Sequence, residues 1–328
     1  MKAIVQERYG SPDGLALREI AKPVAGDDRV LVRVRAASVN ASDWHLMRRL
    51  PHLIGRLLGM PRSRVRGGDF AGQVEAVGSR VTRFTPGDEV FGAGIGSFAE
   101  YTTTFEDRLA PKPRTLTFEQ AAAMPGAGCT ALQGLRDKAQ VKPGQRVLIY
   151  GAGGGVGTFA VQIAKALGAH VTAVTSTGNL DLMRSIGADE TLDYTTEDFS
   201  RRAERYDVVF DNGANRSYAD CQRVLVPNGS LVLCGAPNSM GAMLWRMLKG
   251  RVTPRTGSKR ISYLARVRTP DLVVLKELAE AGKLSPVIDR QYPLSGVPDA
   301  LRYLGTRQAR GKLVISISPG SGGGTPAG

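Results

Sequence analysis

The run Tyr150-Gly151-Ala152-Gly153-Gly154-Gly155-Val156-Gly157 decides the fold of this chain of 328 residues. It directly follows the apolar residues 146–149 and directly precedes the helix-like stretch 158–168. An apolar run, a glycine cluster and a helical pattern in direct succession predict a strand, a tight turn and a helix that form one unit.

Three residues of this run stand at the special positions of a Gly/Ala-x-Gly-x-x-Gly turn. Ala152 occupies the position of the tight bend, Gly154 that of close backbone approach to a phosphate, and Gly157 that of close packing between helix and sheet. Gly155 and Val156 complete the turn. The helix that follows offers free N–H groups and the positive end of its dipole, so the segment predicts a dinucleotide pyrophosphate site.

Length and composition indicate a globular protein of about two domains, given the usual ~150 residues for each and a hydrophobic content of 42%. No stretch approaches the roughly 20 apolar residues that cross a bilayer. Residues 1–8 lack the apolar core of a secretion signal. The three cysteines are far apart and form no Cys-x-x-Cys pair, which argues against a disulfide framework. We therefore expect a cytoplasmic protein without a membrane partner.

The formal charge of +14 is dispersed, with two local concentrations at residues 48–66 and 246–268. Either segment could be a basic amphipathic helix that touches a membrane or a partner, but we interpret both as solvated helices over a substrate cleft. No RNA-binding aromatic motif or zinc finger accompanies the charge, so we expect no nucleic-acid partner. Attraction of a phosphorylated cofactor is a sufficient role for it.

The pattern along the chain changes after about residue 115. Before it, short apolar runs alternate with turn residues, which is typical of a mainly antiparallel β domain. The runs are residues 3–5, 15–17, 30–34, 72–78 and 88–92. Thr117 and Gln120 then fit a capping box that opens an alanine-rich helix.

Strands and helices alternate from there on, which predicts a doubly wound parallel sheet and an α/β fold class. The expected strands are 170–175, 191–194, 206–211 and 230–235, and the expected helices are 180–187 and 221–225. Residues 272–282 have helical spacing, and 312–317 form a final strand that returns to the first domain. We set the domains at 1–115, 116–270 and 271–317, with a disordered Gly- and Pro-rich tail at 318–328.

Several ordered motifs together resemble the medium-chain dehydrogenase/reductase superfamily, and more narrowly its zinc-independent quinone oxidoreductase and enoyl reductase branch. They are residues 37–43, 67–72, 84–90 and 122–125, the glycine turn, and 311–314. The resemblance covers residues 1–317. It implies a GroES-like catalytic domain (1–115 and 271–317) around an inserted Rossmann domain (116–270), with the cofactor in the cleft between them, commonly as a homodimer.

Metal ligands are missing where zinc-dependent members of the superfamily have them. By the resemblance, Asn40 and Gly126 stand in place of two cysteines and Gly68 in place of a histidine, and residues 92–97 replace the cysteine-rich structural loop. We therefore predict no metal. Without a Lewis acid that polarises an alcohol oxygen, alcohol oxidation loses its usual mechanism.

The remaining reaction is hydride transfer from NADPH to the activated C=C bond of an enone, or to a quinone, with a small hydrophobic substrate. The substrate's own carbonyl then accepts the developing charge, and hydrogen-bond donors hold it. Three alternatives stay open: an NAD(P)-dependent alcohol or carbonyl oxidoreductase, a non-catalytic NADPH-binding protein, and a membrane- or RNA-associated protein.

Three candidate catalytic residues follow one another near the first of the replaced ligands. Asn40 has an amide that can donate to the nicotinamide or to a substrate oxygen, or that satisfies a local turn. Asp43 is a proton carrier, or else a cap or an ion-pair partner. His45 titrates in the useful range, or else is a hydrogen-bonded structural histidine.

Cofactor choice depends on the end of the second strand of the α/β domain, where enzymes that prefer NAD usually carry a carboxylate. Here this place holds Thr175, Ser176, Thr177 and Asn179, whose side chains can donate to a 2′-phosphate. The resemblance adds a tyrosine that matches Tyr194 and a basic residue from which Asn179 departs. We therefore predict NADPH.

Other cofactor contacts are expected at the carboxyl edge of the sheet, where the ribose and the nicotinamide bind. Asn212 follows one strand, and Cys234 and Gly235 end another. Lys312 is a further candidate contact to a phosphate or to the nicotinamide side, or else a plain surface lysine.

Overall fold

The computed structural model describes residues 1–48, 65–213, 216–234 and 257–317. The contacts divide the chain into two compact units. The first comprises Met1–Gly126, Val267–Lys276 and Ile288–Gly328, and the second comprises Ala127–Arg266 and Glu277–Val287. The sequence patterns placed the first boundary at 115, whereas the contacts place it after Gly126, whose N–H bonds to the carboxylate of Asp69 in the first unit.

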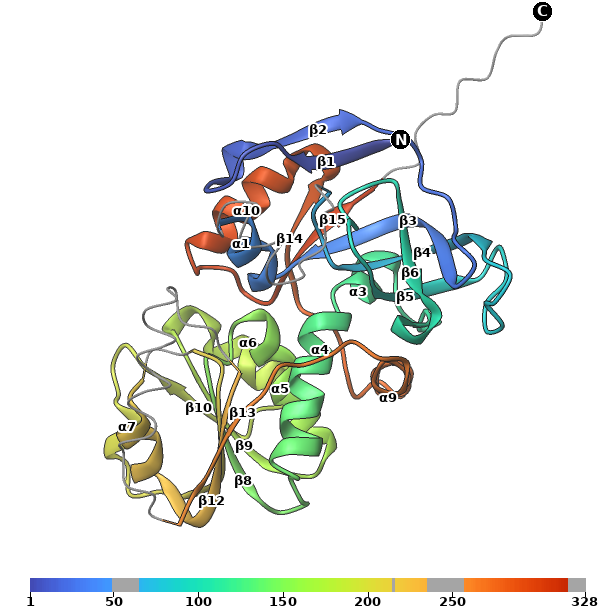
Figure 1. Ribbon diagram of the computed structural model, residues 1–328. Coiled ribbons are helices and arrows are strands. Elements are labelled where there is room, and N and C mark those ends of the chain that lie inside the picture. The colour runs from blue at the N-terminus through green and yellow to red at the C-terminus, as the bar shows by residue number, and fades with distance from the viewer. Residues whose placement is uncertain (49–64, 214–215, 235–256, 318–328) are drawn as a thin grey trace, which may run out of the picture. The chain divides into compact units, whose positions relative to one another are not determined.

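The first unit contains a sheet in the order β14-β15-β3-β4-β5-β7, with β6 paired to β3 (Figure 1). Its strands are β3 (Arg29–Val39), β4 (Asp69–Val77), β5 (Glu89–Ala93), β6 (Tyr101–Phe105), β7 (Leu109–Pro111), β14 (Ile288–Pro293) and β15 (Lys312–Ser316). Every pair except β14–β15 is antiparallel. The mainly antiparallel domain and the returning final strand are thereby confirmed. The strands β1 (Lys2–Gln6) and β2 (Leu15–Glu19) form a separate antiparallel pair.

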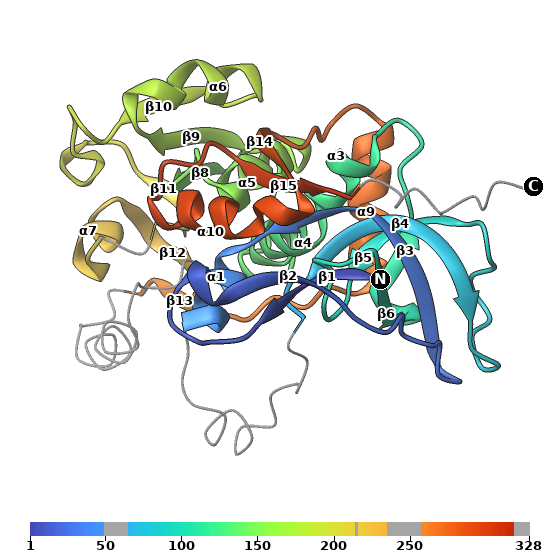
Figure 2. The same cartoon turned by 90° about the horizontal axis from the view of Figure 1, so that it is seen from above.

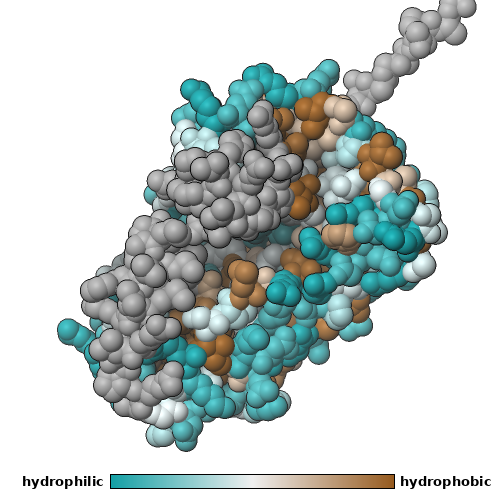
Figure 3. All heavy atoms as spheres, in the orientation of Figure 1, coloured by the Kyte–Doolittle hydropathy of each residue, from teal (hydrophilic) through white to brown (hydrophobic). Residues whose placement is uncertain are grey.

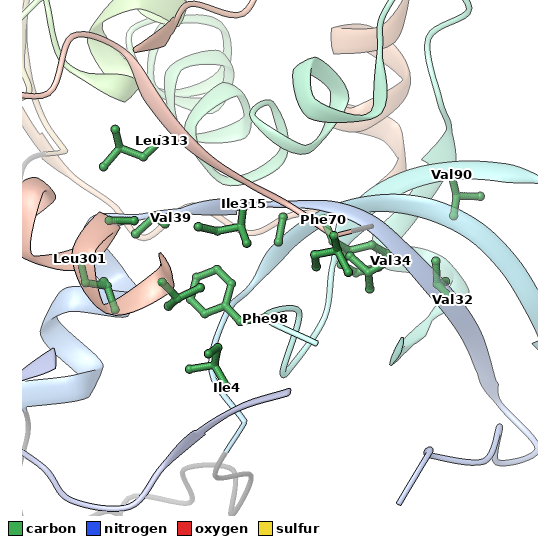
Figure 4. Packing of buried hydrophobic residues seen from close by; sticks show 14 of the residues in the cluster. Ile4, Val32, Val34, Val39, Phe70, Val90, Phe98, Leu301, Leu313 and Ile315 are labelled. Atoms are coloured by element: carbon green, nitrogen blue, oxygen red, sulfur yellow. The ribbon is translucent and has the colours of Figure 1, made fainter. Parts of the chain in front are cut away.

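The core of this unit lies against one face of β3, because alternate residues of a strand point to the same side. Val30, Val32 and Val34 are buried there, together with Phe70 and Phe98. Figure 4 shows Val34, Phe70 and Ile315, from three different strands, close to Phe98, which precedes β6. The helices α1 (Ala41–Arg48) and α10 (Val297–Gly305) pack on each other (Figure 2).

The second unit contains a six-stranded sheet in the order β10-β9-β8-β11-β12-β13, and all its pairs are parallel. The strands are β8 (Arg146–Tyr150), β9 (His170–Thr175), β10 (Glu190–Asp193), β11 (Tyr206–Asp211), β12 (Leu225–Leu233) and β13 (Lys259–Ser262). This is the doubly wound order, which reverses direction between β8 and β11. The Rossmann prediction is confirmed, and the reversal places the ligand site after those two strands.

The remaining helices connect or cover these sheets. They are α3 (Phe118–Ala122), α4 (Pro125–Leu132), a π-helical turn at Gln133–Lys138, α5 (Gly155–Ala166), α6 (Leu180–Ser185), α7 (Tyr218–Arg223) and α9 (Thr269–Glu280). Short 3₁₀ turns occur at Pro12–Gly14, Glu106–Arg108, Thr177–Asn179, Phe199–Arg201 and Leu294–Gly296. The capping box before α3 is confirmed, since Thr117 accepts the N–H of Gln120 and Gln120 accepts that of Thr117.

Two expectations were wrong in part. The helix expected at 221–225 is α7, which ends at Arg223 because Leu225 already begins β12 and pairs with Tyr206. Its start is earlier because Ser217 and Asp220 form a capping box. The basic segment 246–268 was interpreted as a helix, but its described part contains β13, paired with β12. Residues 49–64, 235–256 and the tail 318–328 lie outside the described residues.

The described surface carries hydrophilic side chains over most of the face in Figure 3, with hydrophobic ones scattered among them. In the part of the chain that the structure describes, no helix is long and apolar enough to cross a membrane.

Candidate functional site

The glycine turn connects β8 to α5 in the second unit. Gly154 is the N-cap of α5, and no side chain of the described residues caps this helix, so the N–H groups of its first turn can bind a ligand. A Cβ at Gly157 would lie only 2.3 Å from the carbonyl oxygen of Gly151. The helix can therefore approach the turn only because this position is glycine, as the sequence pattern predicts.

The tight bend itself falls one residue earlier than expected. Gly151 has φ +77°, a backbone conformation that favours glycine, whereas Ala152 is fully buried beside it. Asn212 lies at the same point, because its N–H donates to Tyr150 O at 3.0 Å and its Nδ2 to Gly151 O at 3.4 Å. The turn and Asn212 thus meet where the sheet reverses direction, which is the dinucleotide position of this fold.

The end of β9 brings three of the predicted cofactor residues together. Asn179 Nδ2 donates to Ser176 Oγ at 3.2 Å. A Cβ at Gly153 would lie 2.6 Å from Asn179 Nδ2 and 2.7 Å from Thr175 Oγ1, so these side chains close around the glycine turn. Asn179 Oδ1 is buried and has no hydrogen-bond partner among the described residues. This cradle fits the adenosine end of a dinucleotide.

A carboxylate that the sequence analysis did not name also lies at this edge. Thr177 Oγ1 donates to Asp193 Oδ2 at 2.5 Å, and Thr195 donates to Asp193 Oδ1 through its N–H at 2.9 Å and its hydroxyl at 2.7 Å. These bonds, that from Thr177 first, hold the pKa of the Asp193 carboxyl below its usual value. Tyr194 is 44% exposed, with its ring 6.4 Å from that of Tyr150.

Cys234 lies next to Asn212 at the ends of the adjacent strands β12 and β11. Its Sγ is 3.6 Å from Asp211 O and 3.7 Å from Asn212 Oδ1. Two residues that the strand ends predicted are therefore brought together. Gly235 lies outside the described residues.

The first unit holds a buried polar cluster that we call the Asn40 cluster: Asn40, Asp43, Asp69 and Lys312. Lys312 Nζ donates to Asn40 Oδ1 at 2.5 Å and to Val39 O at 3.1 Å. Asn40 Nδ2 donates to Asp69 Oδ2 at 2.9 Å. Both the oxygen and the nitrogen of the Asn40 amide are thus hydrogen-bonded. The ammonium of Lys312 can bond only to the oxygen and the carboxylate of Asp69 only to the NH2 group, so the orientation of the amide is fixed.

Strand pairing brings this cluster together. Leu313 pairs with Val39 and Ser38 pairs with Asp69, so Lys312, Asn40 and Asp69 follow one another across three adjacent strand ends. Figure 4 shows Val39 and Leu313 on these neighbouring strands. The predicted contact of Lys312 with a cofactor stays a prediction, and the structure buries the Lys312 side chain to 3% exposure.

Asp43 closes the start of α1. Its Oδ2 accepts the backbone N–H of Asn40 at 2.8 Å, which is the capping role that the sequence left open beside a proton-carrier role. Burial raises the pKa of Asp43 to about 7, against the opposing hydrogen bond from Asn40. His45 lies further along α1 and is half-buried. Trp44 packs on α10, since a Cβ at Gly305 would meet its ring at 2.5 Å.

Burial also dominates the other two charged groups. It raises the pKa of Asp69 against the attraction of Lys312, and it lowers the pKa of Lys312 against the attraction of Asp69 and Asp43. One ammonium thus faces two carboxyl groups in a site of low polarity. A cluster of this composition reaches zero net charge when it holds one proton on a carboxyl group.

The positions that the resemblance assigned to metal ligands converge on Asp69. Asn40 and Gly126 both donate to Asp69 Oδ2, the latter at 2.8 Å through its N–H, and Gly68 precedes Asp69 in the chain. A Cβ at Gly126 would lie 2.8 Å from Asp69 Oδ2, so the carboxylate occupies the space beside it. Within the described ranges, no group of three or more His, Cys, Asp or Glu side chains could hold a metal ion.

The sequence missed Asp69, Asp193 and Gly151 as site residues. Asp69 stood inside a quoted motif, and Gly151 inside the glycine run. Asp193 could have been found only from the β9–β10 register, which pairs it with Thr175.

Two family models of dehydrogenases match separate parts of the chain. A family model described as an alcohol dehydrogenase GroES-like domain matches residues 26–114, and one described as a zinc-binding dehydrogenase matches residues 186–315.

Similar proteins cover nearly the whole chain. The 2-methylene-furan-3-one reductase of Solanum lycopersicum is 37% identical over 97% of this chain and 80% of its own length. The chloroplastic NADPH-dependent alkenal/one oxidoreductase of Arabidopsis thaliana is 35% identical over the same shares. The solved quinone oxidoreductase of Coxiella burnetii has a TM-score of 0.84 at 30% identity and covers 97% of this chain and 99% of its own.

Proposed function

The chain belongs to the medium-chain dehydrogenase/reductase superfamily, in its quinone oxidoreductase-like branch, and from that premise we propose a specific reaction. The protein is an oxidoreductase of this type. The proposed reaction is transfer of hydride from NADPH to the activated C=C bond of a small hydrophobic enone, or to a quinone, without a metal ion.

The observation that carries this proposal is the fixed orientation of the Asn40 amide. Lys312 holds the amide oxygen and Asp69 takes one of the two Nδ2 hydrogens. The other hydrogen has no acceptor among the described residues, and Asn40 is only partly buried. The two bonds hold the Asn40 amide in one orientation. Its second N–H can then donate to a substrate carbonyl oxygen on which negative charge develops.

The cofactor supplies the hydride when it is bound, and the chain supplies position and charge. Asn40 donates to the substrate oxygen. Lys312, buried behind the amide oxygen, polarises that amide and strengthens its N–H as a donor. Asp43, whose pKa is raised to about 7, exchanges a proton beside Asn40 in the neutral pH range.

The residues proposed to bind the cofactor belong to the second unit. The uncapped start of α5 and the glycine turn fit a pyrophosphate, and the end of β9 fits the adenosine ribose. NADPH is favoured by the hydroxyl and amide donors at Thr175, Ser176 and Asn179, and by the printed name of the Arabidopsis relative.

A panel of enones, enals and quinones tests the reaction. Purified protein with NADPH should consume the cofactor with at least one class, and product analysis should find deuterium from labelled NADPH on the β carbon of an enone. If the protein binds NADPH tightly but reduces no compound of the panel, the proposed reaction is wrong and the protein is a non-catalytic NADPH-binding protein.

Metal analysis distinguishes the proposed reaction from that of a zinc-dependent alcohol or carbonyl oxidoreductase. If the protein contains stoichiometric zinc and oxidises alcohols, the alcohol or carbonyl oxidoreductase replaces our proposal. The formation of a homodimer and a cytoplasmic location are further parts of the proposal, and light scattering during gel filtration tests the former.

A further inference from the structure

We propose that Asp193 limits the preference for the 2′-phosphate, so that NADH binds to this chain with an affinity close to that of NADPH. This inference rests on the cofactor site of the proposed function. It concerns one residue that the strand-end pattern did not reveal, because Asp193 ends β10 and not β9.

The sheet register places Asp193 at the ribose end of the site. Parallel pairing of β10 with β9 sets Asp193 opposite Thr175, the last residue of the second strand. A carboxylate that selects NAD usually stands at the end of that strand, where it accepts from the ribose 2′-OH. Asp193 brings a carboxylate to the same level from the neighbouring strand.

The hydrogen bonds tie this carboxylate to the loop that would receive the phosphate. Thr177 Oγ1 donates its only hydrogen to Asp193 Oδ2 at 2.5 Å. That hydroxyl is therefore not available as a donor to a 2′-phosphate while the bond lasts. Thr195 donates twice to the other oxygen, so the carboxylate is held in place against the loop.

The other candidate donors at this edge are partly committed as well. Asn179 Nδ2 donates one of its two hydrogens to Ser176 Oγ, and the oxygen of the same amide repels phosphate. Arg184 pairs with Asp181 at 2.6 Å. Arg216 lies 5.9 Å from the Tyr150 ring and 3.6 Å from a carboxylate oxygen of Asp198.

The charge of Asp193 affects the binding of NADPH and NADH differently. A 2′-phosphate carries nearly two negative charges and is repelled by a fixed carboxylate, whereas a ribose 2′-OH is a neutral donor. Thr177 and Thr195 each direct a hydroxyl and a backbone N–H to the Asp193 carboxylate, which holds its charge in place at this edge. A ribose hydroxyl that binds to this carboxylate replaces one of these four donors.

Fragments that carry only the adenosine end test this without any turnover. Calorimetry should give dissociation constants of 2′,5′-ADP and 5′-AMP within about tenfold of each other for the native protein, a gap of less than about 1.4 kcal/mol. Asp193→Asn removes the charge and keeps the size of the side chain, with one acceptor oxygen in place of two. It should tighten 2′,5′-ADP by about tenfold and leave 5′-AMP within about threefold.

Asp137→Asn is the matched control, because it removes a carboxylate of the same unit from the π-helical turn, where it pairs with Arg136. Asp193→Ser, a second neutral variant, guards against a folding defect in the first. The proposal is overturned if the native protein binds 2′,5′-ADP more than about 100-fold tighter than 5′-AMP, or if both fragments respond equally to Asp193→Asn. Failure of the proposed reaction would leave these affinities measurable, and no binding of either fragment would instead reject the cofactor site.

Discussion

Lys312 Nζ donates to Asn40 Oδ1 at 2.5 Å although 272 positions separate the two residues. The contact exists because β15 pairs with the end of β3, so the final strand delivers an ammonium to the amide. Asn40 lies at the N-cap position of α1, where an Asn side chain normally accepts the N–H of the third helical residue. Here Lys312 takes that oxygen, and the amide faces Asp69 instead.

Replacing Lys312 by Met should lower the free energy of unfolding by about 3–5 kcal/mol, because it leaves the buried carboxylate of Asp69 without its cation. Urea unfolding measures the change. The double variant Lys312→Met, Asp69→Asn should recover a large part of it, since both charges are then absent. Equal stability of the single and double variants would contradict the ion-pair role.

Replacing Asp43 by Asn should flatten the pH dependence of stability. Folding raises the pKa of this carboxyl from 3.8 to about 7, so the folded state binds the extra proton. Its stabilising contribution is therefore complete below pH 4 and is lost as the pH rises through 7. The native protein should lose on the order of 2 kcal/mol from this group between pH 5 and pH 8.

Unfolding of both proteins at several pH values between 5 and 8 isolates this contribution. The difference between their free energies of unfolding should change by about 1.4 kcal/mol per pH unit below pH 7 and level off above it. Glu204, which is partly buried and has a pKa lowered to about 2, offers Glu204→Gln as a control without a titration in this range. A difference independent of pH would show that Asp43 does not take up the proton.

Replacing Asn40 by Ala should reduce kcat by about 10²–10³-fold, the usual effect of removing one donor to a developing oxyanion. NADPH affinity should stay within about threefold, because the proposed cofactor contacts of the second unit do not include Asn40. Steady-state kinetics and fluorescence titration measure the two quantities. A parallel loss of cofactor affinity would instead assign Asn40 to the nicotinamide.

Replacing Gly157 by Ala should destabilise the second unit by about 1–3 kcal/mol, because the added methyl group meets two carbonyl oxygens of the turn. Cofactor affinity should fall with it, since the start of α5 must move away from the pyrophosphate position. Gly144→Ala adds a methyl group in open space at another turn of the same unit. Its φ of +81° gives it a strain cost of its own, so only Gly157→Ala should affect cofactor binding.

Local patterns predicted the parts of the fold that neighbouring residues determine. The glycine turn and the box of Thr117 and Gln120 depend on residues within one or two helical turns, and both were found correctly. The helix expected at 221–225 exists as α7 but ends at Arg223, because the apolar residues that follow also suit a buried strand. Pairing of Leu225 with Tyr206 decided between the two, and that pairing is not local.

The candidate site was less accessible to sequence for the same reason. Asn40 and Asp43 are close in sequence and were named together, but Asp69 and Lys312 join them only through strand pairing. The sequence left Lys312 as either a cofactor contact or a plain surface lysine, and only the structure shows that its side chain is buried. Asp193 lies beside the end of β9 because it pairs with Thr175 there. The spacing of the two segments in the sequence does not predict this pairing.

The place of β15 at the end of the sheet order also has a consequence for synthesis on the ribosome. Asn40 and Asp69 are synthesised early, yet β3 lacks its β15 neighbour, and Asp69 lacks the charge of Lys312, until residues 312–316 are made. The second unit lies wholly between these events, and domains generally fold as units in the order of synthesis. We therefore expect the second unit of a nascent chain to fold while the Asp69 carboxylate of the first unit is still exposed to water. The Asn40 cluster then becomes buried in the last step of folding.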